Sequence, residues 1–182
     1  MKIDSKAFSE YSFSQVGVTT ADCFVLVAGD SSSQMDRRYF LIFGDQSGRV
    51  LDASLSNVGE VVLWDRNGGD NQLWYWDGQD RDMLRNKKFP RRVLDFHWGD
   101  YQKHGWGKVY LHEFNGGWNQ KWQYDGRELV CKGFQSKMVH NLRLDVHGSA
   151  TANGAKVGVY QRNGNANQRW QLQGKLHFFT NY

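Results

Sequence analysis

Cysteine and proline are both scarce in this chain of 182 residues, which has two cysteines and one proline, Pro90. Cys23 and Cys131 do not stand at equivalent positions of the repeats described below, which excludes a disulfide framework built on those repeats. We therefore expect two free thiols. A single proline excludes a proline-rich linker.

Long hydrophobic runs are also absent. The longest apolar run, Cys23–Ala28, is far shorter than the roughly 18–20 residues of a membrane-spanning helix, so we expect no membrane span. The N-terminal residues MKIDSKAFSEYS lack the apolar centre of a signal peptide. The compartment stays open, because cytoplasmic location, non-classical release and secretion all fit this sequence.

The excess of positive charge is small, with a formal net charge of +4 at pH 7. One basic cluster is present, and it consists of Arg81, Arg85, Lys87, Lys88, Arg91 and Arg92. Such a cluster can bind polyanions, but no nucleic-acid-binding motif accompanies it. We interpret the cluster as a solvated face and expect no nucleic-acid partner.

The chain does contain a phrase repeated three times. Residues 67–74 read NGGDNQLW, residues 115–122 read NGGWNQKW and residues 163–170 read NGNANQRW, with their glutamines 48 residues apart. A Leu-Asp pair precedes each copy, and an aromatic residue stands eight positions before each glutamine. Repetition at a fixed period indicates one supersecondary unit that buries its core against its copies.

Each repeat predicts about four short strands, because brief apolar runs alternate with Gly, Asn and Asp and no long segment has helical periodicity. The expected strands are 39–43, 49–53, 60–64, 72–76, 83–86, 92–96, 108–112, 120–124, 128–132, 142–146, 156–160 and 168–172, with a further strand at 176–179 beside the first. Three units are too few for a propeller. The prediction is an all-β fold, a β-trefoil with pseudo-threefold symmetry.

The repeats occupy residues 38–182, and residues 1–37 form an N-terminal extension outside them. The extension is not low in apolar residues, so we do not expect disorder. Its alternating apolar positions favour short strands. Packing on the trefoil and self-association into a homodimer are both open for this segment.

Each repeat brings together the groups that bind a sugar. An ionised aspartate such as Asp52 accepts hydrogen bonds from adjacent hydroxyls, and Asn71 both donates and accepts. The ring of Trp64 offers a face for the apolar side of a sugar. Gln72 would orient Asp52, and Trp74, two residues further along an expected strand, would point into the core.

The phrases NQLW, NQKW and NQRW, each preceded by Leu-Asp, resemble the Q-x-W repeats of the ricin B-chain-like (R-type) lectins. The resemblance implies a non-catalytic β-trefoil that binds galactose or N-acetylgalactosamine in up to three shallow sites. The Asp and Asn would bind hydroxyls, the aromatic would stack and the Gln would hold the Asp. Matched by motif, the sites are Asp52, Trp64, Asn71 and Gln72; Asp95, His112, Asn119 and Gln120; and Asp145, Tyr160, Asn167 and Gln168.

The chain departs from this family in ways that make the sites unequal. Many members carry a polar side chain two residues before the stacking aromatic, where this chain has Val62, Tyr110 and Gly158. The stretch from Asp to aromatic has 12, 17 and 15 residues in the three repeats. In the longest stretch, which belongs to the second site, Trp98 and Trp106 would extend contacts to a second sugar or cover the barrel. His112 is the weakest stacker, and we expect the carboxylates at the mouths of the sites.

No catalytic arrangement is predicted. The three aspartates fall on separate units, far from the ~5–10 Å pairing of glycoside hydrolases, and the histidines match no common zinc spacing. We expect no enzyme, no cofactor and no metal, and a multivalent lectin that agglutinates cells. The alternative is a protein-interaction or toxin-targeting module in which some or all sugar sites are inactive.

Overall fold

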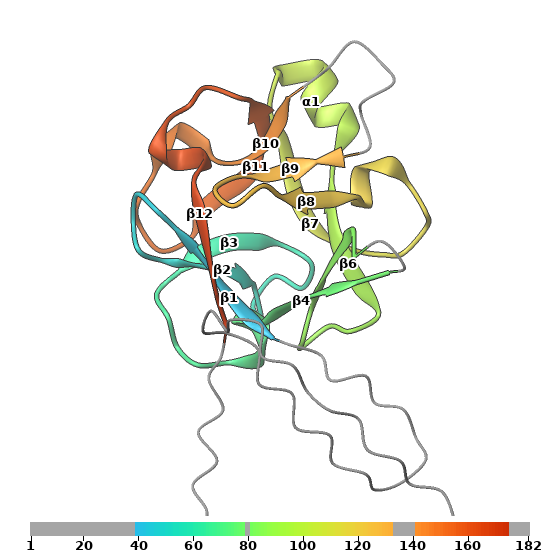
Figure 1. Ribbon diagram of the computed structural model, residues 1–182, viewed down its shortest axis with the longest axis vertical. Helices are drawn as coiled ribbons and strands as arrows, with labels where there is room; N and C mark the ends of the chain where they lie inside the picture. The colour runs from blue at the N-terminus through green and yellow to red at the C-terminus, as the bar shows by residue number, and fades with distance from the viewer. Residues whose placement is uncertain (1–38, 79–80, 133–140, 175–182) are drawn as a thin grey trace, which may run out of the picture. The chain divides into compact units, whose positions relative to one another are not determined.

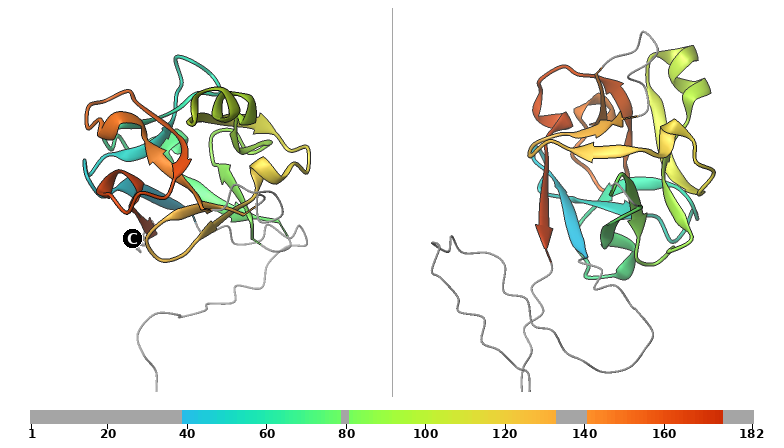
Figure 2. Two further views of the ribbon diagram at one scale, coloured as in Figure 1. Left: turned by 90° about the horizontal axis from the view of Figure 1, so that it is seen from above. Right: turned by 45° about the vertical axis from the view of Figure 1, so that its right-hand side comes forward.

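The computed structural model describes residues 39–78, 81–132 and 141–174, which form an all-β domain (Figure 1). The proposed extension at 1–37, its role in a homodimer and the strand at 176–179 lie outside these residues. Within the described part, β1 (Phe40–Gly44) pairs instead with β12 (Trp170–Gly174), from Phe40 opposite Gly174 to Gly44 opposite Trp170. Figure 2 shows these two strands side by side.

All twelve strands expected within the repeats are present, with ends shifted by at most two residues. Between β1 and β12 they are β2 (Val50–Ala53), β3 (Val61–Trp64), β4 (Trp74–Asp77), β5 (Met83–Asn86), β6 (Arg92–Phe96), β7 (Gly107–Glu113), β8 (Trp122–Tyr124), β9 (Leu129–Cys131), β10 (Leu142–Val146) and β11 (Ala155–Gln161). Four strands belong to each repeat, which confirms the predicted trefoil pattern.

Six strands form a ring and the other six form three hairpins. Antiparallel pairing joins β12, β1, β4 and β5 in order, and joins β8 to β9. Backbone hydrogen bonds from Trp122 to Asp82 and from Trp170 to Arg127 connect these two groups. The hairpins are β2–β3, β6–β7 and β10–β11, and they contact one another where β11 pairs with both β3 and β7.

The tryptophans of the repeated phrase form part of the core. Trp74, Trp122 and Trp170 are fully buried. Each indole N–H donates to the carbonyl oxygen of the leucine that precedes the site aspartate, at 2.9, 2.8 and 3.0 Å. A buried indole needs such a partner, because an unpaired donor would cost free energy. These bonds tie the core of each repeat to the strand that carries its aspartate.

The sequence predicted that the glutamines of the repeated phrase begin strands, and the structure shows that they do not. Each one ends a short 3₁₀ turn, at Asp70–Gln72, Trp118–Gln120 and Ala166–Gln168. The preceding Asn-Gly pairs bend the chain, with φ of +78° at Gly68, and prevent the following strand from starting until the tryptophan. Gln72 and Trp74 are therefore not two residues of one strand.

A helix, α1 (Trp98–His104), was not predicted by the sequence pattern. The side chain of His97 accepts a hydrogen bond from the backbone N–H of Asp100 at its start, and Gly105 ends it in the left-handed conformation at φ 69°. Trp98 stacks on Tyr101 and packs against the core. The helix lies in the long stretch between Asp95 and His112, and its seven residues are too few to give a periodic signal.

Candidate functional site

The first repeat holds a carboxylate between two amides. Asn71 Nδ2 donates to Asp52 Oδ1 at 2.9 Å, and Gln72 Nε2 donates to Asp52 Oδ2 at 2.8 Å. The same two amides also donate to the carbonyl oxygens of Ala53 and Asp65, at 3.2 and 2.9 Å. Asp52 is thus fixed in one orientation by side chains from a turn 19 residues away.

The other repeats build the same arrangement. Asp95 accepts from Asn119 at Oδ1 and from Gln120 at Oδ2, both at 2.7 Å, so each carboxylate oxygen accepts one bond. Asp145 accepts from Asn167 at 2.8 Å and Gln168 at 2.9 Å, but here both bonds reach the same oxygen, Oδ2. The structure therefore brings together each predicted set of Asp, Asn and Gln.

The glutamines also explain the asparagine that opens each phrase. In the first repeat Gln72 Oε1 accepts the backbone N–H of Asn67 at 2.8 Å, and Asn67 Oδ1 accepts the N–H of Gly69 at 2.8 Å. Equivalent bonds exist in the second and third repeats. One glutamine therefore orients the carboxylate and closes the turn at the same time.

An exposed ring accompanies each carboxylate. In the hairpin register Asp52 faces Val62, and Trp64 stands two residues further on the same face of β3. His112 and Tyr160 hold the same positions relative to Asp95 and Asp145. Trp64 and Tyr160 are 44% and 42% exposed, so part of each side chain is accessible to a ligand.

The carboxylates themselves are buried, which corrects the expectation that they lie at the mouths of the sites. Asp52, Asp95 and Asp145 are 5%, 1% and 3% exposed. Burial raises the pKa of all three above the ordinary 3.8, while the hydrogen bonds from the amides lower it in part. Each carboxylate is therefore covered by the amides and presents little surface of its own.

The position two residues before the aromatic differs in every site. Val62 is apolar and buried, so it gives Asp52 no further hydrogen bond. The hydroxyl of Tyr110 is close enough to Asp95 to lower the pKa of that carboxyl, and burial together with the Asp95 charge raises the pKa of Tyr110 to about 12. Gly158 has no side chain, and Trp106 lies against its Cα instead. From the sequence, Trp106, in the loop of the second site, was expected to reach a second sugar or cover the barrel, whereas the structure places it beside Gly158 of the third site.

Loops from neighbouring repeats border the sites. Asn153 of the third repeat accepts from the backbone N–H of Asp65 at 2.8 Å and donates to its carboxylate at 2.7 Å, beside Trp64. Gly59 of the first repeat accepts from the N–H of Leu111 at 2.6 Å, next to His112. The surroundings of each site thus depend on two repeats, which the period of the sequence alone did not reveal.

One polar feature outside the three candidate sites is the basic cluster. Part of the basic cluster is neutralised, by the ion pairs Arg85–Asp77 at 2.5 Å and Lys87–Asp70 at 2.9 Å.

No group of three His, Cys, Asp or Glu side chains suited to a metal occurs within residues 39–78, 81–132 and 141–174. Within those same ranges, no helix has the length and apolar character to cross a bilayer.

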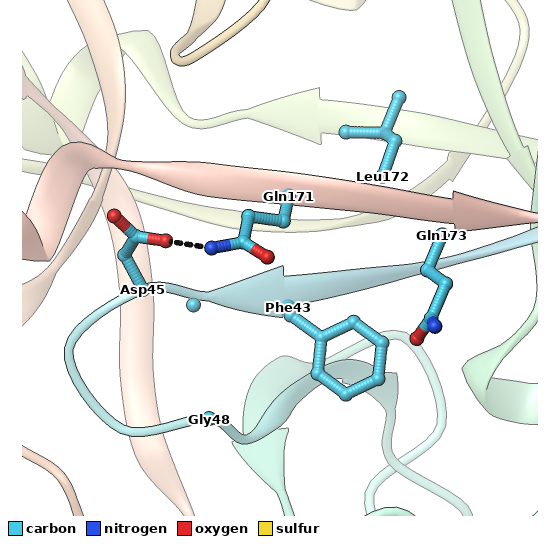
Figure 3. Close-up of a pocket in the computed structure, with 7 residues that line it drawn as sticks. Phe43, Asp45, Gly48, Gln171, Leu172 and Gln173 are labelled. Carbon is cyan, nitrogen blue, oxygen red and sulfur yellow. Dashed lines mark hydrogen bonds between the residues drawn. The ribbon is translucent and has the colours of Figure 1, made fainter.

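A shallow hollow between β1 and β12 is separate from the three candidate sites. It is lined by Phe43, Gly44, Asp45, Gly48, Gln171, Leu172 and Gln173. Figure 3 shows that Gln171 crosses it to hydrogen-bond Asp45, at 2.5 Å. None of the twelve predicted site residues lines this hollow.

Comparisons with known proteins agree with this geometry. A model of the ricin-type β-trefoil lectin domain matches residues 38–170. The comparison with curated proteins gave no match. Among solved structures, the designed threefold-symmetric protein ThreeFoil is 27% identical, with a TM-score of 0.62 over 74% of this chain and 97% of that one.

Two natural proteins are similar as well. The C-terminal half of the earthworm R-type lectin, solved with N-acetylgalactosamine, is 23% identical, with a TM-score of 0.60 over 76% of this chain and 99% of that one. An exo-β-1,3-galactanase from Clostridium thermocellum is 27% identical, with a TM-score of 0.62 over 78% of this chain but only 31% of that one. The family match covers most of the sequence, and this chain belongs to the ricin-type β-trefoil lectin family.

Proposed function

We propose that this lectin domain binds terminal galactose or N-acetylgalactosamine of glycoproteins and glycolipids, through up to three shallow sites. The observation that carries the proposal is the threefold pairing of an amide-held carboxylate with a ring on the same face of a hairpin. Galactose has an axial 4-hydroxyl, so one face of its ring is apolar while hydroxyls 3 and 4 point the same way. The ring would stack, and the two hydroxyls would reach Asp and Asn.

The sites are expected to differ in strength. The first and third have large exposed rings, Trp64 and Tyr160. In the second, the Tyr110 hydroxyl already stabilises the charge of Asp95, which is the most buried of the three aspartates. A sugar there would have to compete with Tyr110 and stack on His112, so we rank the second site weakest.

Binding of the chain to a glycan array and to immobilised galactose tests the proposal, with immobilised mannose as the matched control. We expect retention on galactose, release by free galactose and no retention on mannose. A single shallow site should have a dissociation constant on the order of 0.1–1 mM. Retention on mannose or glucose alone would contradict the proposal.

The second candidate is a targeting module for a larger protein. The similar galactanase is about three times longer than the part that matches this chain, so in that protein the matching part belongs to a longer chain. A module of this kind would bind a target and would not catalyse a reaction itself. We do not propose an enzymatic activity for this domain. If the chain fails to bind any glycan on the array, the candidate role becomes protein interaction.

A further inference from the structure

Trp106 lies at the third sugar site although it belongs to the second repeat. A Cβ atom built on Gly158 would stand 2.3 Å from Trp106 Cζ2 and 2.5 Å from its Cε2. The indole also contacts His147, with ring centroids 4.5 Å apart. The ring thus fills the place that the side chains of Val62 and Tyr110 fill in the other two sites.

The strand pairing explains this placement. β7 and β11 are neighbours, with Lys108 opposite Gly158 and Gly107 opposite Val159. Trp106 immediately precedes β7, so it lies next to this pair. Any side chain at position 158 would collide with the indole and with the carbonyl oxygen of Gly107, 2.5 Å away. Glycine is therefore required at 158 for Trp106 to reach the third site.

Unpaired polar atoms gather at the same place. Trp106 Nε1 and Asn167 Oδ1 are buried and have no hydrogen-bond partner among the described residues. The indole N–H still acts on the carboxyl of Asp145 and lowers its pKa, without meeting the geometry of a hydrogen bond. Both amides donate to Oδ2 of Asp145, so neither uses Oδ1. The site therefore offers one donor, Trp106 Nε1, beside acceptor oxygens of Asp145 and Asn167.

Buried donors and acceptors without partners cost about 1–3 kcal/mol each, so a ligand that pairs them would gain from the contact. A sugar hydroxyl can accept one hydrogen bond and donate another. Two neighbouring hydroxyls can therefore accept from the indole and donate to the oxygens of Asp145 and Asn167. No such set exists at the first site, where Val62 replaces the donor.

We propose that Trp106 is a specificity-determining residue of the third site, where its indole N–H donates to a hydroxyl of the bound galactose-type sugar. The inference rests on the proposed function of this site. It makes the third site a composite of two repeats, Tyr160 supplying the stacking face and Trp106 a hydrogen bond. If Trp106 instead only filled the site, its removal would leave sugar binding unchanged or stronger.

The test uses a chain with one working site. In a Trp64→Ala, His112→Ala background the third site alone keeps its ring, and Trp106→Phe then removes the N–H while keeping an aromatic side chain on Gly158. Titration with methyl β-galactoside should show roughly three- to tenfold weaker binding, the loss of one hydrogen bond. Trp98→Phe in the same background, a tryptophan of the same loop that stacks on Tyr101 and not on Gly158, should bind as the background does.

A second background separates a local effect from a general one. With His112→Ala and Tyr160→Ala, only the first site keeps its ring, and there Trp106→Phe should not alter the affinity. Unchanged or tighter third-site binding by Trp106→Phe overturns the inference but leaves the proposed function intact. Absence of galactose binding by the parent chain overturns both.

A measurement on the parent chain covers the case in which Trp106→Phe does not fold. The indole N–H resonance of Trp106 in a ¹H–¹⁵N spectrum should shift on addition of methyl β-galactoside, because the proton enters a hydrogen bond. Methyl α-mannoside serves as the control sugar. A Trp106 resonance that stays in place while other third-site signals move would overturn the inference.

Discussion

Asp, Asn and Gln of each repeat serve both the fold and the candidate site. Gln168 closes a turn through the N–H of Asn163 and holds Asp145, while Trp170 ties the core to β10. The core residue and the proposed ligand residue can still be told apart, because Tyr160 is 42% exposed and Trp170 only 1%. This contrast predicts that replacing Tyr160 affects sugar binding and that replacing Trp170 affects stability.

Tyr160→Ala should weaken sugar binding at the third site and leave the unfolding free energy within about 0.5 kcal/mol, as for most surface substitutions. Trp170→Ala should lower the unfolding free energy by roughly 3–5 kcal/mol, because it empties a core position. Denaturant melts and galactose titrations of both variants check this. A stable Trp170→Ala that has lost binding would show that core and ligand residues are assigned the wrong way round.

As the pH is lowered, sugar binding should weaken at a higher pH than it would if the site aspartates were exposed. Burial raises the pKa of Asp52 and Asp145 above 3.8, and only the ionised carboxylate accepts from two hydroxyls. Affinity for galactose should therefore begin to fall at pH values above 3.8 as the pH is lowered. Calorimetric titrations between pH 7 and pH 4 measure this fall. An affinity that does not change between pH 7 and pH 4 would contradict the prediction.

The raised pKa also affects stability, and acid should stabilise the fold through this group although it weakens sugar binding. Because the folded-state pKa of Asp145 lies above the unfolded value, the native state binds this proton more readily, and protonation favours folding. The stability of the parent relative to Asp145→Asn should therefore rise as the pH falls through the raised pKa. Urea melts of both chains at matched pH values test this, and a relative stability that falls with acidification would show a lowered pKa.

At the scale of strands and loops, the hairpins of neighbouring repeats meet at the sites. β11 pairs with both β3 and β7, and Gly158 permits its approach to the Trp106 side of β7. The strands themselves could be predicted from the sequence, because short apolar runs between Asn-Gly turns are a local signal. The placement of Trp106 could not, because it depends on the pairing of strands from two repeats.

Two local features were also beyond the sequence pattern. The glutamines were expected in strands, but their side-chain bonds to the Asn67-type turns hold them in 3₁₀ turns. α1 is a single short helix in a loop, with a histidine cap rather than a Ser, Thr, Asp or Asn cap. Two features of the sequence were consistent with the position of Trp106 at the third site. They are the length of the stretch from Asp95 to His112 and the glycine at position 158.

Gly158→Ala should destabilise the domain by roughly 1–3 kcal/mol, because the added methyl meets the backbone of Gly107 and the Trp106 ring. Gly174→Ala in β12 is the matched control, since a Cβ there meets nothing within 4 Å. Thermal melts of the two variants decide the matter. Equal stability of Gly158→Ala and Gly174→Ala would mean that β11 and β7 do not approach as closely as described.

For the whole molecule, the pseudo-threefold arrangement places the candidate sites on three separate hairpins. A protomer with two working sites could hold two glycan chains, and a second, intramolecular contact can raise avidity roughly 10²–10⁴-fold over one site. The proposed lectin should therefore bind a galactose-coated surface far more tightly than free galactose and should agglutinate cells.

Valency is tested by removing both strong rings. Trp64→Ala with Tyr160→Ala should lose most of the surface avidity and the agglutination, because only the His112 site remains. Each single variant should keep one strong site and bind free galactose with an affinity close to that of the parent. A double variant that agglutinates like the parent would place the multivalency in the second site or in self-association.

The central claim is that the amide-held carboxylates with their exposed rings are galactose sites. A ¹H–¹⁵N NMR titration of the parent chain with methyl β-galactoside tests it most directly, with methyl α-mannoside as the control. The side-chain signals of Asn71 and Asn167 and the indole signal of Trp64 should move with the galactoside and stay in place with the mannoside. Movement confined to the hollow between β1 and β12 or to the basic cluster, or no movement at all, would contradict the claim.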